Sequence, residues 1–313
     1  MKTNLPSLEV IIPEKLQFFL ALSRTQHGVL DMMSPVFAVL VYMGRIPDLA
    51  VILIGIMTVF SGYTCVYALN DIVGLKNDKK NIDIETKPTG SSDLDAVFIR
   101  HPLAQGNLGL LSASIWAAFW GITALVGAYY LNPVCVLIFV SAAVLEVLYC
   151  FLLKITFLRI IVTGFVKSAG PIAAVFAVDP APEPLLPMLI FVFHFLWEGG
   201  GQNIPNDYMD MENDKRLGAK TLPLKFGRNI TSWLITGLLM GSLCTMVIIF
   251  YFSPIDFNII SYGVLIFGSF FLLIFPSLLL NYTKKNEEAM ILFNKASYYP
   301  LFLSILITIH LII

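Results

Sequence analysis

Nine long apolar stretches restrict the fold of this chain more than any other feature of its sequence. A helix needs roughly 20 residues to cross the hydrocarbon core of a bilayer, and each stretch is about that long. Within lipid only helices or closed barrels satisfy every backbone polar group, and these unbroken runs lack the alternation of barrel strands. We therefore predict an all-α polytopic membrane protein with spans at residues 25–44, 48–70, 107–127, 131–153, 158–178, 184–202, 230–252, 258–281 and 290–313.

Composition excludes an ordinary soluble domain, because 57% of the 313 residues are hydrophobic and only 13% are charged. The net charge of −1 gives no reason to expect a nucleic-acid partner, and the expected surroundings are the lipid bilayer. The four cysteines stand singly in apolar segments, so we expect neither a disulfide framework nor a zinc site. The first 16 residues are mixed polar, so we expect no cleavable signal peptide, and the first span would serve as the insertion signal.

The basic residues predict which side of the membrane each loop faces. Seventeen of the 20 Lys and Arg residues lie in the N-terminal segment and in alternate loops, all on one side of the predicted bundle. Because cytoplasmic loops carry the excess of Lys and Arg, this side is expected to be cytosolic. Residues 71–106 and 203–229 form two long polar loops on that side, and loops of this length are usually functional. We expect them to cap a single transmembrane domain that spans residues 1–313.

One of these loops carries three aspartates at helical spacing. Asp207, Asp210 and Asp214 recur at i, i+3 and i+7, which on a helix puts three carboxylates on one face over two turns. Such a cluster repels itself, so it is either solvated or bound to a cation. Hard oxygen ligands with room for water suit Mg²⁺ better than a transition metal. The spacing therefore predicts a magnesium site at the cytosolic end of the sixth span.

A second, weaker acidic motif follows the second span, where residues 70–78 read NDIVGLKND. Asp71 and Asp78 share a helical face, but Gly74 occupies the position where a middle carboxylate would lie. Two acidic helix ends, each following an apolar span, predict a pair of metal sites that face each other across a membrane cavity. The alternative for either motif is a solvated acidic helix end.

Four segments together resemble the UbiA superfamily of intramembrane prenyltransferases. Residues 206–227, NDYMDMENDKRLGAKTLPLKFG, resemble the second aspartate-rich motif and the loop after it, and NDIVGLKND resembles the first motif, usually NDxxDxxxD. Residues 100–106, RHPLAQG, resemble the RPLPSG-like stretch before the third helix, and residues 22–27, LSRTQH, resemble the start of the first. The resemblance covers essentially the whole chain. It implies nine helices around a central cavity, with both motifs on the cytosolic side.

The resemblance also implies a reaction, in which a prenyl diphosphate ionises and its prenyl group passes to a second substrate. Two or more Mg²⁺ ions, bound with the diphosphate, would stabilise the leaving group. Gly74 departs from the family pattern, so the first metal would be bound more weakly, or through Asn77, Asp83 or water. The five aspartates would be the catalytic residues, with one ion held by Asp207, Asp210 and Asp214 and the other by Asn70, Asp71 and Asp78.

Basic and aromatic side chains near the motifs are candidates for substrate binding. Arg100, Lys154, Arg216 and Lys225 are expected to pair with phosphate oxygens, although the ordinary cytosolic excess of basic residues is the alternative. His101 stands where the family commonly has an arginine. The aromatic candidates, whose faces would stabilise a carbocation, are Tyr149 and Trp197; the alternative for both is packing.

Several ionisable residues fall inside predicted spans, where they are costly and usually face the interior of the bundle. One interpretation is structural, with Lys167 neutralised by Glu146 or Glu198. In the other, these side chains shape the acceptor pocket or take the proton lost after attack on the cation. The residues in this class are Asp31, Glu146, Lys167, His194, Glu198 and Lys295.

Three functions remain open at the level of sequence. The first is prenyl transfer to a hydrophobic acceptor, either an aromatic quinone precursor or an alcohol. The second is cyclisation of the diphosphate substrate without an acceptor, as in some relatives. The third is a cation transporter, which would place acidic clusters near the membrane midplane on broken helices, whereas these motifs fall at predicted cytosolic ends.

Overall fold

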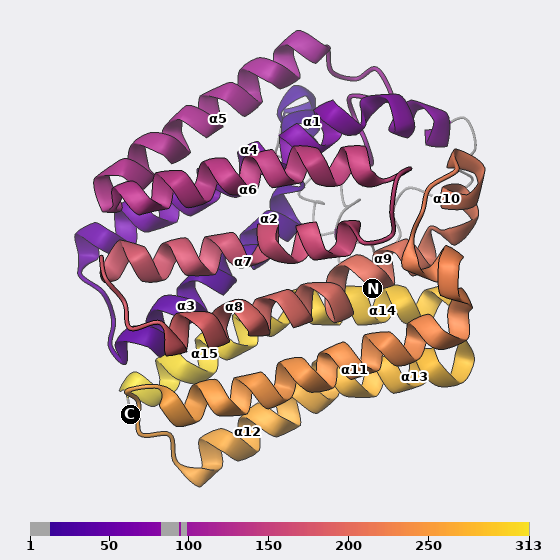
Figure 1. The fold of residues 1–313 in the computed structure, drawn as a ribbon. Helices are drawn as coiled ribbons and strands as arrows, with labels where there is room; N and C mark the ends of the chain where they lie inside the picture. Colours follow the sequence, from indigo (N-terminus) through magenta and orange to yellow (C-terminus); the bar gives the residue numbers. More distant parts are fainter. Residues whose placement is uncertain (1–12, 83–93, 95–98, 313) are drawn as a thin grey trace, which may run out of the picture.

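The computed structural model describes residues 13–82, 94 and 99–312, and among them every extended element is a helix (Figure 1). Asp83 and most of the segment between residues 83 and 98 lie outside the described residues. The α-helices are α1 (Glu14–Leu22), α2 (Thr25–Asp31), α3 (Met33–Met43), α4 (Leu49–Ile82), α5 (Leu110–Leu131), α6 (Pro133–Leu152), α7 (Arg159–Val178), α8 (Leu185–Trp197), α9 (Ile204–Met209), α10 (Met211–Leu217), α11 (Leu222–Phe252), α12 (Ile259–Ser269), α13 (Phe275–Thr283), α14 (Asn286–Ser297) and α15 (Tyr299–Ile312).

The predicted all-α bundle is confirmed, and most predicted spans correspond to one long apolar helix or helix pair. Four predicted spans are interrupted: 258–281 contains the π-helical segment Phe270–Ile274 between α12 and α13, 290–313 divides into α14 and α15 at Tyr298, and the other two are 25–44 and 184–202. The span at 25–44 divides into α2 and α3 at Met32, and the span at 184–202 passes from α8 into the π-helical segment Glu198–Asn203. Seven helices of the described chain are long and apolar enough to cross a membrane: Leu49–Lys80, Leu110–Leu131, Pro133–Leu152, Arg159–Val178, Leu222–Phe252, Ile259–Thr283 and Asn286–Ile312.

The outer faces of these helices are apolar, as expected for a multi-pass protein surrounded by lipid. Leu111 and Tyr130 on α5, Leu137 on α6 and Ile259 on α12 are all more than two-thirds exposed. In water this exposure would be unfavourable, whereas hydrocarbon tails match it. The bundle therefore buries its polar groups inside and turns its apolar groups outward.

The two predicted cap loops are partly helical. Helix α4 continues past the apolar span to Ile82, and Lys79 and Lys80 lie in its last turn, where positive charge favours the helix dipole. Residues 203–229 include α9, α10 and the start of α11. Four of the five aspartates in the acidic motifs are thus held on helices, and Asp210 lies at the junction between α9 and α10.

The helices enclose two regions of different character. A well-packed apolar core joins α3, α8, α11, α14 and α15, with fully buried side chains such as Phe37, Phe193, Leu239 and Leu303. On the other side α5 packs along α4, and α6 packs along α7 (Figure 1). Helix α7 lies between these two regions, since it also contacts α3 and α8.

The π-helical segment Glu198–Asn203 fits closely against α11. A Cβ atom at Gly200 would lie 2.9 Å from Leu239 Cγ and 3.1 Å from the carbonyl oxygen of Ile235, so only glycine permits this approach. Such π-helical insertions are frequent at functional sites, because they shift the register of the residues that follow. Here the segment leads directly into α9, which carries Asp207.

Candidate active site

Both acidic motifs line one polar cavity of about 230 Å³. Asp71 and Asp78 reach it from α4, Asp207 from α9, Asp214 from α10, and Asp210 from the junction between those two helices. The structure thus brings together all five aspartates singled out in the sequence. Asn70, Arg100 and Tyr149 line the same cavity.

The second motif does not lie on one continuous helix, as its spacing predicts. Asp210 has φ −94° and ψ 10°, outside the helical range, and separates α9 from α10. This break changes the direction of the chain within the motif. All three carboxylates nevertheless line the cavity, so the break alters how they are presented without separating them.

Burial governs the charges of this motif. Asp207 is 6% exposed and accepts a hydrogen bond from Arg159 Nη2 at 2.6 Å. Burial raises the pKa of Asp207, while the positive charge of Arg159 acts in the opposite direction. Burial raises the pKa of Asp214 to about 7, and the negative charge of Asp207 adds to this shift. The two carboxylates therefore resist simultaneous ionisation unless a cation is bound.

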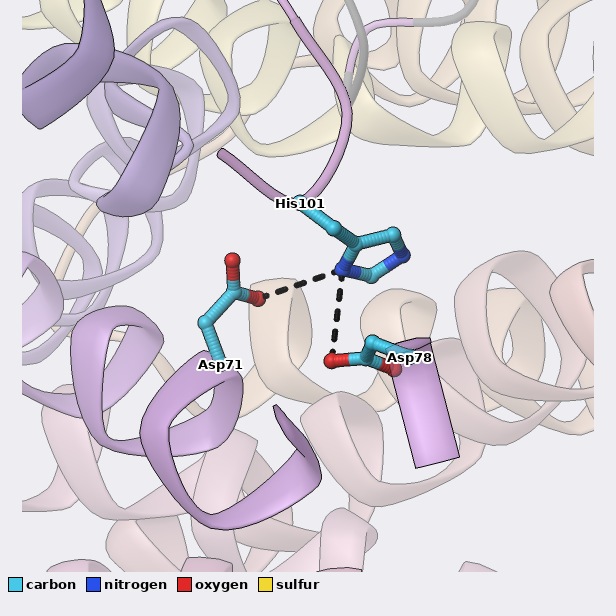
Figure 2. A group of neighbouring side chains, drawn as sticks. All are labelled: Asp71, Asp78 and His101. Atoms are coloured by element: carbon cyan, nitrogen blue, oxygen red, sulfur yellow. Dashed lines mark ion pairs between the residues drawn. The ribbon is translucent and has the colours of Figure 1, made fainter. Parts of the chain in front are cut away.

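The first motif is completed by a histidine from the loop before α5 (Figure 2). His101 Nδ1 lies 3.7 Å from Asp71 Oδ1 and 3.4 Å from Asp78 Oδ2. Burial lowers the pKa of His101, but the two carboxylates outweigh that effect, so its pKa is raised above the ordinary value. Asn70 Nδ2 donates a hydrogen bond to Glu146 Oε1, which leaves the side-chain oxygen of Asn70 available to a ligand.

Arginines alternate with the acids around the cavity. Arg24 Nη2 lies 3.5 Å from Asp71 Oδ1, and Arg100 Nη2 donates a hydrogen bond to Asp210 Oδ2 at 3.3 Å. Arg159, besides bonding Asp207, holds its guanidinium 4.5 Å from the centroid of the Tyr149 ring. Three cationic side chains therefore surround the space between the two motifs.

Four predicted substrate-binding residues lie away from this cavity. Lys154, Arg216 and Lys225 are not among the side chains that line it, and the Lys225 ammonium lies 3.9 Å from the centroid of the Phe157 ring. Trp197 is 1% exposed, and its indole Nε1 donates to the carbonyl oxygen of Ala296 at 3.1 Å. Trp197 thus belongs to the packed core.

Sequence reasoning did not single out Arg159, and it used Arg24 only through the resemblance of residues 22–27. Both arginines stand next to apolar helices on the side that the sequence predicts to be cytosolic, where an excess of basic residues is ordinary and marks no single one as functional. A signal was present for Arg159, because it is the first residue of α7 and lies at the predicted membrane boundary. Glu198 was recognised in the sequence as an ionisable residue inside a span, but its neighbours Gln202 and Asn203 in the same polar wall were not, because the π-helical segment has no simple sequence period.

An apolar chamber of about 550 Å³ adjoins the polar cavity and is lined mainly by residues of α3 to α7, with Thr308 of α15. Tyr67, Glu146, Thr163 and Lys167 line both spaces, so we call these four residues the neck. The chamber walls are almost entirely aliphatic and aromatic. A polar head and a long apolar tail on one molecule would match this pair of spaces.

At the neck, Lys167 is neutralised by a partner other than the two expected. Lys167 Nζ lies 2.5 Å from Asp31 Oδ2 and donates to the Tyr67 hydroxyl at 2.9 Å. Lys167 is therefore neutralised by a buried partner, as the structural interpretation expects, but within the described residues that ion pair is with Asp31 and not with Glu146 or Glu198, whose carboxylates accept hydrogen bonds from Asn70 and Thr163. Asp31 lies more than 130 residues away in sequence, and only the packing of α2 and α3 beside α7 brings it to Lys167.

The residues present fit divalent cations. Asp71 Oδ1 and Asp214 Oδ2 are buried, and within the described residues neither accepts a hydrogen bond. Buried carboxylate oxygens are normally hydrogen-bonded or bound to a cation. The donor set is mainly carboxylate oxygen, which suits hard ions such as Mg²⁺.

Comparison with known proteins identifies the family. A 4-hydroxybenzoate octaprenyltransferase from Shewanella denitrificans is 26% identical over 240 residues, 74% of this chain and 75% of the relative. A solved structure of digeranylgeranylglyceryl phosphate synthase matches with a TM-score of 0.65 at 20% identity, covering 96% of this chain and 99% of that one. A UbiA homologue from Archaeoglobus fulgidus, bound to DMAPP and Mg²⁺, gives 0.61 at 16% identity, covering 93% and 99%. The model of the UbiA prenyltransferase family matches residues 32–305, and the chain therefore belongs to this family of prenyltransferases.

Proposed function

We propose that this protein transfers a prenyl group from an isoprenoid diphosphate to a hydrophobic acceptor within the membrane, in a reaction that depends on Mg²⁺. One observation carries the proposal: the polar cavity that gathers both acidic motifs adjoins the apolar chamber, and the four residues of the neck line both spaces. A prenyl diphosphate has the same division between a charged head and an apolar tail. The bound DMAPP and Mg²⁺ of the Archaeoglobus fulgidus relative support this assignment.

The charged end of the donor would lie among the arginines of the polar cavity. Arg24, Arg100 and Arg159 each hold a planar guanidinium beside an aspartate of one of the motifs. Such groups form paired, charge-assisted hydrogen bonds with phosphate oxygens. Because each arginine already contacts an acid, its side chain is oriented before the substrate arrives, which lowers the entropy lost on binding.

The metal would be held by the five aspartates together with the Asn70 side-chain oxygen, as two or more ions. Bound Mg²⁺ supplies electrostatic stabilisation of the negative charge that develops on the departing diphosphate. The buried oxygens of Asp71 and Asp214, which lack hydrogen-bond partners within the described chain, support this use. The aspartates themselves fix the position of the head group relative to the neck.

The apolar chamber would receive the prenyl tail and keep water from the carbocation. Each buried CH₂ group contributes about 0.8 kcal/mol, so a long tail gains considerable affinity from such walls. Tyr67 lines both spaces at the neck, but its ring already lies 5.6 Å from the Arg24 guanidinium and 5.4 Å from the Lys167 ammonium, and its hydroxyl donates to Asp31. Tyr149 is in a similar position, because the Arg159 guanidinium lies 4.5 Å from the centroid of its ring.

The excess of Lys and Arg on the side of both motifs supports a cytosolic opening of the polar cavity. Mg²⁺ and phosphorylated metabolites would then reach the site from the cytosol, while the acceptor would enter from the lipid. An aromatic acceptor is favoured by the name of the Shewanella relative, which acts on 4-hydroxybenzoate. An alcohol is the alternative acceptor.

The test is turnover by the purified protein in lipid nanodiscs, with Mg²⁺, prenyl diphosphates of several lengths, and 4-hydroxybenzoate present or absent. We expect diphosphate release and a prenylated product, and we expect Asp71→Asn and Asp207→Asn to abolish both. Glu212→Gln is the matched control, because Glu212 lies exposed on α10 within the same acidic motif and does not line the cavity. Full turnover in both aspartate variants would refute the proposal. If a cyclic hydrocarbon forms in the absence of acceptor, the reaction is cyclisation of the diphosphate substrate and not prenyl transfer.

A further inference from the structure

The first acidic motif of this chain lacks a middle carboxylate, and the structure shows what lies in its place. At Gly74 an added Cβ atom would lie 3.1 Å from Asp78 Oδ2. The carboxylate of Asp78 therefore folds back along α4 into the space beside position 74. The remaining side of the motif is occupied by His101, which comes from a different segment of the chain (Figure 2).

We propose that Asp71, Asp78 and His101 form a mixed oxygen and nitrogen site for a divalent cation, in which the His101 imidazole replaces the absent carboxylate. The inference rests on the proposed function, since it concerns the cation held by the first motif. It adds that this cation site accepts a transition-metal ion such as Mn²⁺ and binds it through nitrogen. Imidazole is a ligand that transition metals accept more readily than Mg²⁺ does.

The geometry supports a shared ligand among these three side chains. One ligand atom from each residue lies within 4.8 Å of the other two. Nδ1 of His101 points between Asp71 and Asp78, as Figure 2 shows. Among the described residues this is the one group of His, Cys, Asp and Glu side chains with such spacing.

The hydrogen-bond inventory points to a missing ligand. Asp71 is 3% exposed, and neither its Oδ1 atom nor His101 Nδ1 has a hydrogen-bond partner in the described chain. Arg24 Nη2, at 3.5 Å from the same Asp71 oxygen, contributes charge at a longer distance. A cation between Asp71 and His101 would satisfy both atoms, and binding would displace any proton on the imidazole.

The backbone at His101 supports a positioning role for this residue. His101 has φ +52°, in the left-handed region, which is uncommon for a residue other than glycine. The loop that follows is stabilised by backbone hydrogen bonds from Gln105 to His101 and from Asn107 to Pro102. This conformation directs the imidazole toward α4.

The experiment uses the purified full chain in nanodiscs with Mn²⁺ alone, so that it does not depend on turnover. Mn²⁺ affinity is measured from the electron paramagnetic resonance signal of free Mn²⁺, and electron spin echo envelope modulation detects ¹⁴N bound directly to the metal. We expect ¹⁴N modulation in the unaltered protein. We expect His101→Gln to abolish it and to weaken Mn²⁺ binding at this site at least about tenfold, in the range typical of a lost metal-site contact.

Two further variants separate ligation from an ion-pair role. His310→Gln, far from the motif and bonded to Ser261, is the matched control and should keep the nitrogen signal. Gly74→Asp added to His101→Gln should restore affinity without the ¹⁴N modulation, because it supplies an oxygen ligand. The proposal is overturned if Mn²⁺ binds to the unaltered protein without ¹⁴N modulation, or if His101→Gln leaves that signal unchanged. It is also overturned if His101→Gln tightens Mn²⁺ binding, because the imidazolium of His101 would then have been competing with the metal for the two carboxylates. A protein that lacks prenyl transfer but shows the ¹⁴N signal would refute the proposed function alone.

Discussion

Arg159 at the start of α7 donates a hydrogen bond to Asp207 on α9 at 2.6 Å, and both side chains are less than a tenth exposed. The pair joins the second acidic motif to the helix that also lines the apolar chamber. A buried ion pair of this kind is costly to break, because the remaining charge loses its partner in a medium of low dielectric. Arg159 thus fixes the position of Asp207 and adds positive charge beside the expected diphosphate.

Replacing Arg159 by Gln should remove most of the activity. Loss of one partner from a buried, hydrogen-bonded charge pair costs about 2–5 kcal/mol, and if that cost falls on the transition state, turnover should drop by about 1.5 to 3.7 orders of magnitude. Arg159→Lys should retain part of it, because charge remains but the planar geometry does not. The measurement is diphosphate release at saturating Mg²⁺. Arg45→Gln, at an exposed position on the opposite side, should leave the rate unchanged; equal rates in Arg159→Gln and the unaltered protein would contradict the assignment.

Stability without metal should depend on pH through Asp214. Burial raises the pKa of this carboxyl to about 7, whereas in the unfolded chain it titrates near 3.8. Between these values the folded state binds the extra proton, so stability falls as the pH rises through this window and stays low above it. A divalent cation replaces the proton and removes the penalty.

We therefore expect Mg²⁺ to raise the melting temperature more at about pH 8 than at about pH 6. Asp214→Asn should reduce the difference between the two pH values, because the amide does not titrate. Glu212→Gln, which removes an exposed carboxylate from the same motif, is again the control and should keep the difference between the two pH values. Thermal unfolding followed by tryptophan fluorescence is the measurement, and an equal Mg²⁺ effect at both pH values would exclude this role of Asp214.

The helices and the clustered aspartates could be predicted from the sequence, but the side chains that pair with those aspartates could not. Long apolar runs and spaced aspartates are local patterns, so the bundle and the five carboxylates could be predicted. The break at Asp210 and the π-helical segment Glu198–Asn203 could not, because they depend on close packing against α11 and on which backbone hydrogen bonds form.

Partners across the bundle were the harder problem. Each of the two ion pairs that most shape the site, Arg159 with Asp207 and Lys167 with Asp31, joins residues far apart in sequence. The sequence indicates that Lys167, a charged residue inside a predicted span, needs an acidic partner. Several acids lie in predicted spans, and the sequence does not distinguish which of them contacts Lys167. Trp197 illustrates the same limit, since an aromatic side chain in an apolar span reads alike whether it faces a cavity or the core.

The pair of Lys167 and Asp31 should be required for folding. Both side chains are buried at the neck, so we expect Lys167→Met to destabilise the protein by about 3–5 kcal/mol through the unpaired Asp31 carboxylate. The double variant Lys167→Met with Asp31→Leu should recover much of this loss, because no buried charge remains. Denaturant unfolding in detergent is the measurement. A double variant less stable than the single variant would show that the pair stabilises the fold by more than mutual neutralisation.

The depth of the apolar chamber should limit the length of the prenyl tail. Gly55 lines the chamber on α4, with no atom within 4 Å of an added Cβ, so a side chain there projects into open space. It lies 16 residues before Asp71, or about 24 Å along the helix axis. Gly55→Trp should therefore reduce turnover of long prenyl diphosphates by at least tenfold and leave short ones nearly unaffected, because only long tails reach that depth.

The control for this variant is Gly263→Trp on α12, which also has open space around the added Cβ but does not line the chamber. Competition between short and long donors in one reaction, analysed by product mass, measures the ratio of their kcat/KM values directly. A steric limit predicts a change in that ratio, since short donors bind at the polar end alone. An equal loss for all donor lengths in Gly55→Trp would mean that the tail does not extend along α4, and the chamber would then be assigned to the acceptor.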